Sequence, residues 1–354
     1  MEFSLEKLVR ENIRSLKPYS SARDEFMGAA KVFLDANENS MGSPLTKWYN
    51  RYPDPHQEKL KEEIVKVKNL TIDQVFIGNG SDECIDLLYR CFCRPAIDNV
   101  IICPPTYGMY EACGAINEVQ VRKVQLLPNF QLDLDGVAEA VDENTKLIWI
   151  CSPNNPTGNV MDREEIESIL LNFTGLVVVD EAYVNFSRHR SFIPSLVDYP
   201  NLVVLQTFSK AWGLAGLRLG MAFASPAIIA LLHRIKPPYN ISQVSQELAI
   251  KALGEVGQVN DMIRELVNMR EALAEVFSRI PIVEKVYPSQ ANFILVKMME
   301  ATRVYDFLKS KGIIVRDRSA EPLCQNCLRI TVGTEEENTK LVDAMAEYLN
   351  TLVK

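Results

Sequence analysis

The chain has 354 residues, a formal net charge of −8 and a hydrophobic content of 47%. These values exclude an intrinsically disordered chain, a collagen and a bare coiled coil, and the length fits about two globular domains. A net-acidic chain lacks the electrostatic footprint of a nucleic-acid binder, so nucleic acid is not an expected partner. No apolar run reaches the ~20 residues of a membrane span, and no uninterrupted apolar run follows the N-terminus. The sequence therefore predicts a cytoplasmic protein without a membrane partner.

Short apolar runs alternate with segments of helical periodicity over roughly residues 30–240. The apolar runs, each an expected strand, are residues 75–77, 99–103, 147–151, 176–179 and 202–205. Helical stripes precede and separate them, for example at residues 60–67 and 162–173. Strands that are apolar on both faces belong in a parallel sheet covered by helices. The pattern therefore predicts an α/β domain with a mostly parallel sheet.

The pattern changes after Pro237-Pro238, where a long helical stripe begins. Short strands are expected at residues 293–296, 313–315 and 328–332, and Thr334 with Glu337 caps a last helix. This order predicts a smaller α+β domain. The expected division is an N-terminal arm that packs with the small domain, a large domain and the small domain, at residues 1–30, 31–240 and 241–354.

Ligands of open parallel sheets bind at the carboxyl ends of the strands, so the residues that follow each apolar run are informative. The first such segment is Gly78-Asn79-Gly80-Ser81-Asp82-Glu83. A glycine turn before a helix offers backbone N–H groups to an anion. It is no dinucleotide fingerprint, because Glu83 stands where a third glycine is required. By itself, the segment fits a capped helix start at least as well.

The next two segments present amides and a carboxylate. Ser152–Gly158 carries two asparagines between prolines, which fits either a ligand site or a well-made turn. Asp180 ends an apolar run and needs a cation or hydrogen-bond donors, since burying an unpaired carboxylate is costly. Alternatively, Asp180 caps a following helix. Glu181 points to the opposite face of the strand, so the two carboxylates cannot share one site.

The fourth segment runs from Thr207 to Arg218 and contains Lys210 directly after an apolar strand. A partly desolvated lysine beside another cation has a lowered pKa and can form a Schiff base. Arg218 suits a phosphate, because its planar guanidinium can bind two oxygens. The alternative is an ordinary surface lysine in a loop.

Together, the four segments match one ligand, pyridoxal phosphate. Its aldehyde would join Lys210, its protonated ring nitrogen would face Asp180, and its ring oxygen would face Asn155. Its phosphate would be held by Gly80, Ser81, Ser209 and Arg218.

The segments Ser152–Gly158, Asp180–Tyr183 and Ser209–Arg218 resemble the signatures of fold-type-I pyridoxal-phosphate aminotransferases. Further motifs resemble, more narrowly, the histidinol-phosphate aminotransferases within the class-II group. These motifs are Pro18-Tyr19 with Ala22-Arg23, Leu34–Asn39, Tyr52–Pro55, Gly78–Glu83, Pro105–Tyr110 and Leu328–Thr334. They run in family order from residue 18 to residue 334 and so cover nearly the whole chain.

The resemblance implies a homodimeric transaminase with shared active sites that acts in histidine biosynthesis. It would interconvert L-histidinol phosphate plus 2-oxoglutarate and imidazole acetol phosphate plus L-glutamate in two half-reactions. Lys210 would be the Schiff-base lysine and proton shuttle, Asp180 the partner of the ring nitrogen, and Tyr183 a partner of the ring oxygen with Asn155. The other implied cofactor residues are Ser81, Asp82, Tyr107, Ser209, Arg218 and, reaching the neighbouring subunit's cofactor, Tyr52. The implied substrate residues are Tyr19, Asn37, Arg316 and Arg329.

Other functions remain open on the sequence alone. Within the same cofactor class, the alternatives are an aromatic-amino-acid aminotransferase and a threonine-phosphate decarboxylase. A second class of hypothesis is a cofactor-bound regulator or binding module without turnover. The sequence offers no DNA-binding segment that would support it. No metal site is expected, because the three histidines are isolated and Cys324-Gln325-Asn326-Cys327 has no second pair of ligands.

Overall fold

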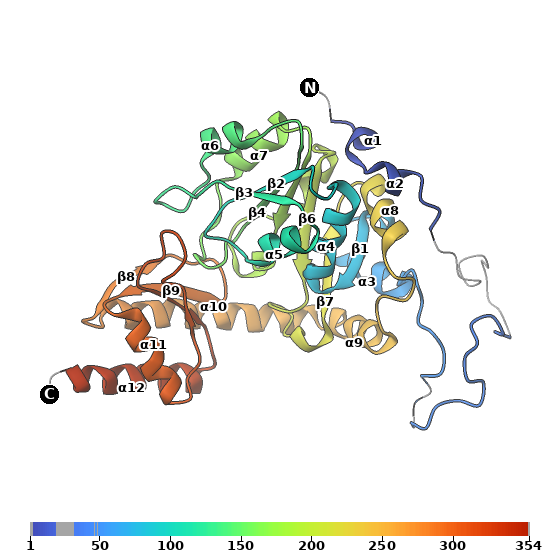
Figure 1. The fold of residues 1–354 in the computed structure, drawn as a ribbon. Coiled ribbons are helices and arrows are strands. Elements are labelled where there is room, and N and C mark those ends of the chain that lie inside the picture. Colours follow the sequence, from blue (N-terminus) through green and yellow to red (C-terminus); the bar gives the residue numbers. More distant parts are fainter. Residues whose placement is uncertain (1–2, 19–31, 46, 48, 353–354) are drawn as a thin grey trace.

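The fold of this chain, a computed structural model, is described for residues 3–18, 32–45, 47 and 49–352. A large sheet with helices on both faces forms one part, and a smaller sheet forms the other (Figure 1). The long helix α10 (Val256–Ser278) connects the two parts. Its residues near Val259 pack with the large part, whereas Leu273 and Phe277 lie in the core of the small part.

The large sheet has the strand order β1-β7-β6-β5-β4-β2-β3. Its strands are β1 (Val75–Asn79), β2 (Asn99–Ile102), β3 (Gln120–Lys123), β4 (Thr145–Cys151), β5 (Leu176–Asp180), β6 (Leu202–Thr207) and β7 (Leu219–Phe223). Neighbouring strands pair in parallel, except that β7 runs antiparallel to both β1 and β6. The expected mostly parallel sheet is confirmed. Strands β3 and β7 were missed, because β3 has three polar residues out of four, and β7 contains a glycine and follows a loop directly.

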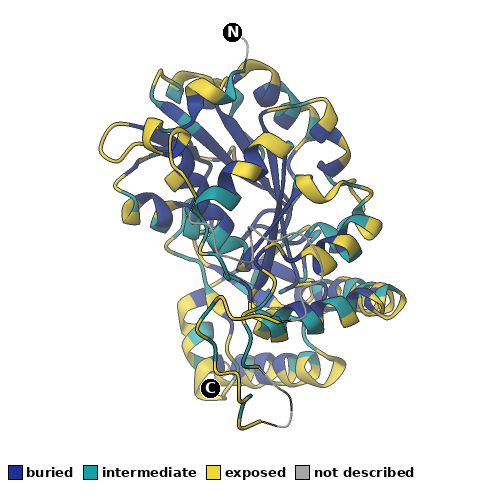
Figure 2. Cartoon of the chain, turned by 90° about the vertical axis from the view of Figure 1, so that its right-hand side faces the viewer, coloured by how far each residue is buried: buried dark blue, intermediate teal, exposed yellow. Residues whose placement is uncertain are grey.

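Helices cover both faces of this sheet, as the apolar strands require. The helices are α3 (Glu58–Lys68), α4 (Gly80–Phe92), α5 (Met109–Ile116), α6 (Leu134–Ala140), α7 (Arg163–Asn172), α8 (Pro226–Ile235) and α9 (Gln243–Leu253). Alternate residues of one strand enter opposite cores: Ile148 faces α3 and α7, whereas Trp149 faces α4 and α5. Figure 2 shows the buried strands enclosed between helices whose outer faces are exposed.

The described part of the N-terminal arm packs against the large part. It contains α1 (Leu5–Leu8) and α2 (Glu11–Arg14). Leu8 and Ile13 join the core that α4 and α8 form, and the Arg10 N–H donates to the carbonyl oxygen of Cys91 at 3.1 Å. The expectation that the arm packs with the small domain is therefore wrong for residues 3–18, because its apolar side chains cover α4 and α8 instead.

The smaller sheet is antiparallel, with the strand order β10-β11-β9-β8. Its elements are β8 (Val283–Tyr287), β9 (Phe293–Met298), α11 (Ala301–Ser310), β10 (Arg316–Asp317), β11 (Cys327–Thr331) and α12 (Glu335–Leu352). The strand expected at residues 313–315 instead begins at Arg316. Helix α9 packs against α3 of the large part. The expected boundary between the large and the small domain, between residues 240 and 241, stays a prediction.

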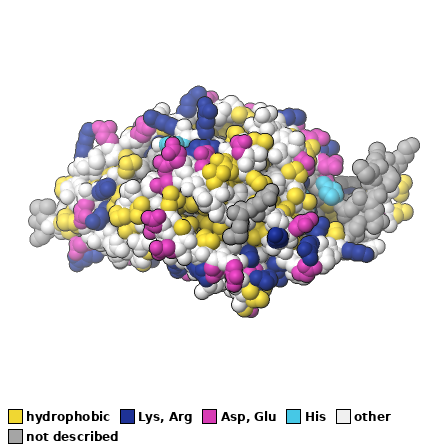
Figure 3. Space-filling view, turned by 90° about the horizontal axis from the view of Figure 1, so that it is seen from above, with side chains coloured by type: hydrophobic (Ala, Val, Ile, Leu, Met, Phe, Trp, Pro, Cys, Tyr) yellow, Lys and Arg dark blue, Asp and Glu magenta, His cyan; other side chains and the backbone are white. Residues whose placement is uncertain are grey.

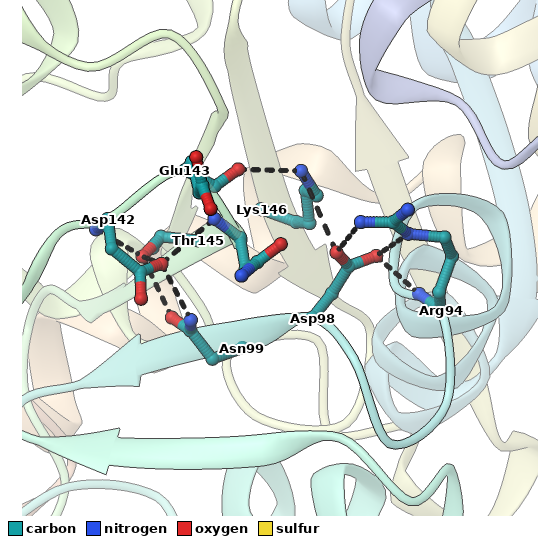
Figure 4. A network of polar contacts seen from close by, with 8 residues as sticks. Arg94, Asp98, Asn99, Asp142, Glu143, Thr145 and Lys146 are labelled. Atoms are coloured by element: carbon teal, nitrogen blue, oxygen red, sulfur yellow. Dashed lines mark hydrogen bonds and ion pairs between the residues drawn. The ribbon is translucent and has the colours of Figure 1, made fainter.

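A polar network closes the amino ends of β2 and β4 (Figure 4). Asp98 is buried and accepts hydrogen bonds from the Arg94 side chain and backbone, and Lys146 Nζ lies 3.7 Å from its Oδ1. Burial opposes the charge of Asp98, yet these partners hold its pKa below the usual value. The network satisfies polar groups at the end of the strands that lies opposite the predicted ligand site.

The surface mixes both charges. On the face in Figure 3, Lys and Arg side chains are interspersed with Asp and Glu side chains and with apolar ones. Among the helices of the described residues, none is long and apolar enough to cross a membrane.

Candidate active site

A cavity of about 220 Å³ lies between the two sheets. It is lined by the residues that follow the carboxyl ends of β4, β5 and β6 and by residues of β10 and β11. The structure brings the following predicted site residues together around it: Ser81, Asp82, Tyr107, Asn155, Asp180, Tyr183, Ser209, Lys210, Arg218, Arg316 and Arg329.

Asp180 ends β5, and the residue is only 2% exposed. Its Oδ2 accepts a hydrogen bond from the Tyr110 hydroxyl at 2.7 Å, and its Oδ1 accepts one from the Ala182 N–H at 3.0 Å. Burial raises the pKa of Asp180 to about 6, against the effect of these two hydrogen bonds. A carboxylate in this position gains from a cationic N–H donor in the cavity. Glu181 lies on the opposite face, where Ser191 and Gln206 donate to it, so the two carboxylates do not share a site.

Lys210 follows β6 and projects into the same cavity. Its Nζ has no hydrogen-bond or ion-pair partner among the residues that the structure describes, and it lies 5.6 Å from the ring centroid of Tyr183. Partial burial and the charge of Arg329 lower the pKa of Lys210, an effect that Asp180 moderates and Arg218 reinforces. A lowered pKa increases the share of neutral amine, which is the nucleophilic form.

An anion cradle lies at the start of α4. The first N–H groups of this helix have no partner within the helix, and the helix dipole favours a negative group there. Gly80 has φ +72°, and a Cβ on it would lie 2.9 Å from Arg218 Nη2. Gly220 of β7 packs so closely on the backbone of Gly80 and Ser81 that a Cβ would overlap it, at 2.1 Å from the Ser81 nitrogen. Arg218 Nη2 lies 3.5 Å from Asp82 Oδ2, beside the cradle.

The two asparagines after β4 make different contacts. Asn154 is fully buried and bonds to the Pro105 carbonyl oxygen and to Thr157 Oγ1, so it holds the turn. Asn155 lines the cavity, where its Nδ2 lies 3.4 Å from the Tyr183 hydroxyl. The sequence alone left this segment open between a turn and a ligand site. The structure shows the turn and places Asn155 at the cavity wall, while ligand binding by Asn155 stays a prediction.

Three arginines approach the cavity from the small sheet. Arg316 of β10 pairs in register with Arg329 of β11, and Arg318 lies two residues further on, hence on the same side. Arg318 was not predicted, although the alternation of a strand that starts at Arg316 would have found it. Its Nη1 pairs with Glu321 at 2.6 Å. The Nε atoms of Arg318 and Arg329 are buried without a hydrogen-bond partner in the described part of the chain, so this side of the cavity suits an anion.

Tyr110 was also missed, since its contact with Asp180 spans 70 residues of sequence. Tyr107, which was predicted, donates from its hydroxyl to Asp82 Oδ1 at 3.0 Å.

The remaining predicted residues lie elsewhere. Asn37 and Tyr52 line a separate hollow of about 430 Å³, and Tyr52 stacks on Tyr239 with 4.5 Å between ring centroids. The described residues between 32 and 57 loop out from the body (Figure 1). The expectation that Asn37 sits near the substrate is therefore not met within one chain. Tyr52 was expected to serve a neighbouring subunit, which stays a prediction. Tyr19 lies outside the described residues.

The comparisons with known proteins agree with this fold. The family model "Aminotransferase class I and II" matches residues 31–345, and the chain belongs to this family. A histidinol-phosphate aminotransferase of Cytophaga hutchinsonii is 51% identical over 98% of this chain and 100% of its own length. One from Bacteroides thetaiotaomicron is 52% identical, over 98% and 99%.

Solved structures share the fold. The histidinol-phosphate aminotransferase from Sinorhizobium meliloti, in complex with pyridoxal-5'-phosphate, has a TM-score of 0.81 and 26% identity, with 90% of each chain covered. The enzyme from Clostridium acetobutylicum has a TM-score of 0.79 and 23% identity, with 86% of this chain and 92% of its own covered. The predicted fold-type-I architecture is confirmed.

Proposed function

We propose that the chain is a pyridoxal-phosphate-dependent transaminase that moves an amino group between L-histidinol phosphate and 2-oxoglutarate. The observation that carries this proposal is one cavity with three complementary parts: a lysine amine that has no hydrogen-bond or ion-pair partner among the described residues, a buried carboxylate, and positive groups at two separate places. The names of relatives about 50% identical over nearly the full length support the substrate.

The residues around the cavity fit the cofactor. The cradle of Gly80, Ser81 and Arg218 would hold its phosphate, and Asp180 would face its ring nitrogen. Asn155 and Tyr183 would hold its ring oxygen, while Asp82, Tyr107 and Ser209 complete the wall. When bound, the cofactor supplies an electron sink that stabilises negative charge at the α carbon of the substrate.

The chain's own residues supply proton transfer and substrate binding. Lys210 Nζ, once neutral, is the base placed to take the proton from the substrate's α carbon and to return it for the amino transfer. Asp180 keeps the ring nitrogen protonated. Arg329 binds the carboxylate of glutamate in one half-reaction and the phosphate of histidinol phosphate in the other, assisted by Arg316.

We propose a cytoplasmic homodimer in which Tyr52 reaches the cofactor phosphate of the neighbouring subunit. Tyr52 lies outside the cavity of its own chain. On the same looping segment, Leu34 is 84% exposed and Met41 is 88% exposed. Apolar side chains exposed in this way are typical of a surface that a partner covers. Light scattering of the purified protein should give the mass of two chains.

A panel of amino donors tests the proposed reaction. The purified protein, loaded with pyridoxal phosphate, is given glutamate, histidinol phosphate, phenylalanine, tyrosine or threonine phosphate, with and without 2-oxoglutarate. Histidinol phosphate should give the highest kcat/KM, and only with the keto acid present. Release of carbon dioxide from threonine phosphate without a keto acid would indicate the decarboxylase instead. Cofactor absorbance unchanged by every donor, glutamate included, would indicate a regulator without turnover.

A further inference from the structure

Tyr110 is a buried hydroxyl aimed at the carboxylate of Asp180. It lies on α5 and is fully buried, and its hydroxyl is 2.7 Å from Asp180 Oδ2. An ionised carboxylate can only accept hydrogen bonds, so the tyrosine hydroxyl is the donor. A donor bonded to a charged acceptor makes a hydrogen bond roughly twice as strong as a neutral one.

The surroundings of Tyr110 hold its hydroxyl in place. Its ring stacks on Trp149, with ring centroids 5.0 Å apart and planes 14° apart. Trp149 stacks in turn on Tyr89, and the Tyr89 hydroxyl donates to the carbonyl oxygen of Tyr110 at 2.7 Å. Tyr107 contacts Tyr110 edge-on. Because Trp149 and Tyr107 pack directly against the ring of Tyr110, its hydroxyl cannot turn away from Asp180 at little cost.

The hydrogen bond acts against the burial of Asp180. Burial favours the neutral acid, whereas donation from Tyr110 favours the carboxylate. The Ala182 N–H occupies the other oxygen, and Asp180 still lines the cavity. Loss of the Tyr110 hydroxyl would therefore make Asp180 a stronger base. It would then compete better for a proton that it shares with a ligand in the cavity.

We propose that Tyr110 is a positioning residue for Asp180: its hydroxyl keeps the carboxylate ionised and oriented, so that the proton shared with the cofactor's ring nitrogen stays on the nitrogen. The inference rests on the proposed function, because it assumes that pyridoxal phosphate fills the cavity. A proton on the nitrogen gives the ring the positive charge on which its electron sink depends. A proton on Asp180 would leave the ring nitrogen neutral.

Other titratable groups also interact with Asp180 and affect whether its carboxyl group is ionised. They are Asp82 and Cys84 on α4, Tyr107 ahead of α5, Cys151 on β4, Tyr183 after β5 and Lys210 after β6. The Tyr110 hydroxyl and the Ala182 N–H are the donors bonded to Asp180 among the described residues.

Tyr110→Phe tests the proposal, with Tyr89→Phe as the matched control. Both variants remove one buried tyrosine hydroxyl beside the same tryptophan, but the Tyr89 hydroxyl bonds to a backbone oxygen and not to Asp180. Each protein is loaded with pyridoxal phosphate that carries ¹⁵N in the ring. The ¹⁵N chemical shift reports whether the ring nitrogen is protonated, and it is followed against pH. Separately, the glutamate half-reaction is followed by cofactor absorbance in single turnovers.

In Tyr110→Phe, the ring nitrogen should lose its proton at a lower pH than in the wild type or in Tyr89→Phe. The single-turnover rate with glutamate should fall about 10- to 100-fold, with the glutamate dissociation constant changed less than about threefold. A ¹⁵N titration and a rate in Tyr110→Phe that match those of Tyr89→Phe would overturn the proposal.

A second replacement covers the case in which Tyr110→Phe fails to fold or to bind the cofactor. Site-specific 3-fluorotyrosine at position 110 keeps the ring and makes the hydroxyl a stronger donor, so the ring nitrogen should hold its proton to a higher pH. An unchanged titration there would also overturn the proposal. If wild-type protein takes up no pyridoxal phosphate, or ignores glutamate, the proposed function fails first, whatever the variants do.

Discussion

Arg329 of β11 donates a hydrogen bond from Nη1 to Oδ1 of Asn155, which lies 174 residues earlier in the loop after β4. The bond joins β11 of the small sheet to the loop that follows β4 of the large sheet, and both residues line the cavity. Arg329 Cζ also lies 5.3 Å from the ring centroid of Phe293. Arg329 therefore links the two parts of the chain, and it is also the residue proposed above to bind the substrate anions.

Replacing Arg329 with alanine should weaken the binding of both substrates. One guanidinium is proposed to serve the glutamate carboxylate and the histidinol-phosphate phosphate, so kcat/KM should fall about 10- to 100-fold for each. The kcat/KM values of Arg329→Lys should lie between those of the wild type and those of Arg329→Ala, because an ammonium group keeps the charge but lacks the planar, two-pronged geometry of a guanidinium. The control is Arg303→Ala, which removes an exposed arginine of α11 that pairs with Glu300. It should leave kcat/KM unchanged for both substrates. Loss for one substrate alone would contradict the dual role.

Arg318 should discriminate between the two substrates. A phosphate offers three terminal oxygens and a second charge, so it can use a guanidinium that a carboxylate already bound by Arg329 does not need. Arg318→Gln should raise the KM for histidinol phosphate about 10-fold and change that for glutamate less than about threefold. Glu321→Gln removes the carboxylate that pairs with Arg318, and it should lower the KM for histidinol phosphate. Equal effects of Arg318→Gln on both substrates would refute this assignment.

Asp180 should destabilise the cofactor-free protein at neutral pH. Its pKa of about 6 in the fold lies above the value of about 3.9 in an unfolded chain, so folding disfavours its charged form. At pH 7–8, Asp180→Asn should raise the free energy of unfolding of the cofactor-free protein by about 2–3 kcal/mol. The gain should shrink as the pH falls from 6 to 4 and vanish below that.

Urea unfolding at several pH values measures this difference, with the exposed Asp198→Asn as control. The same Asp180→Asn variant should lose nearly all transaminase activity, because the amide cannot hold the charge of the ring nitrogen. A variant that is less stable than wild type at pH 8 would show that the buried carboxylate does not carry this cost.

The sequence predicted the large sheet and the residues at its carboxyl edge because both follow from local patterns. Apolar runs mark the central strands, and the polar residues directly behind them meet at one edge, as Asp180 and Lys210 do. Strands β3, β7 and β8 and the position of β10 were not found, since short strands with polar residues in or beside them carry little periodicity. The contact between Tyr110 and Asp180 could not be read from spacing, because only the tertiary fold brings α5 to the end of β5.

The two cysteines Cys324 and Cys327 illustrate a motif that the structure explains by packing. Both are buried, and burial raises the pKa of Cys324 to about 12 and that of Cys327 to about 11. Such thiols are poor nucleophiles and poor metal ligands at neutral pH. Among the described residues, no group of three potential ligands could hold a metal ion.

The most direct measurement concerns the amine of Lys210. Protein loaded with pyridoxal phosphate is reduced with borohydride, which fixes the cofactor to the amine that it is bonded to, and the digested peptides are mapped by mass. The tag should be found on Lys210 of the wild type, and Lys210→Ala should carry no tag and show no turnover, whereas Lys59→Ala should behave as wild type. A tag on another lysine, or turnover by Lys210→Ala, would contradict the account.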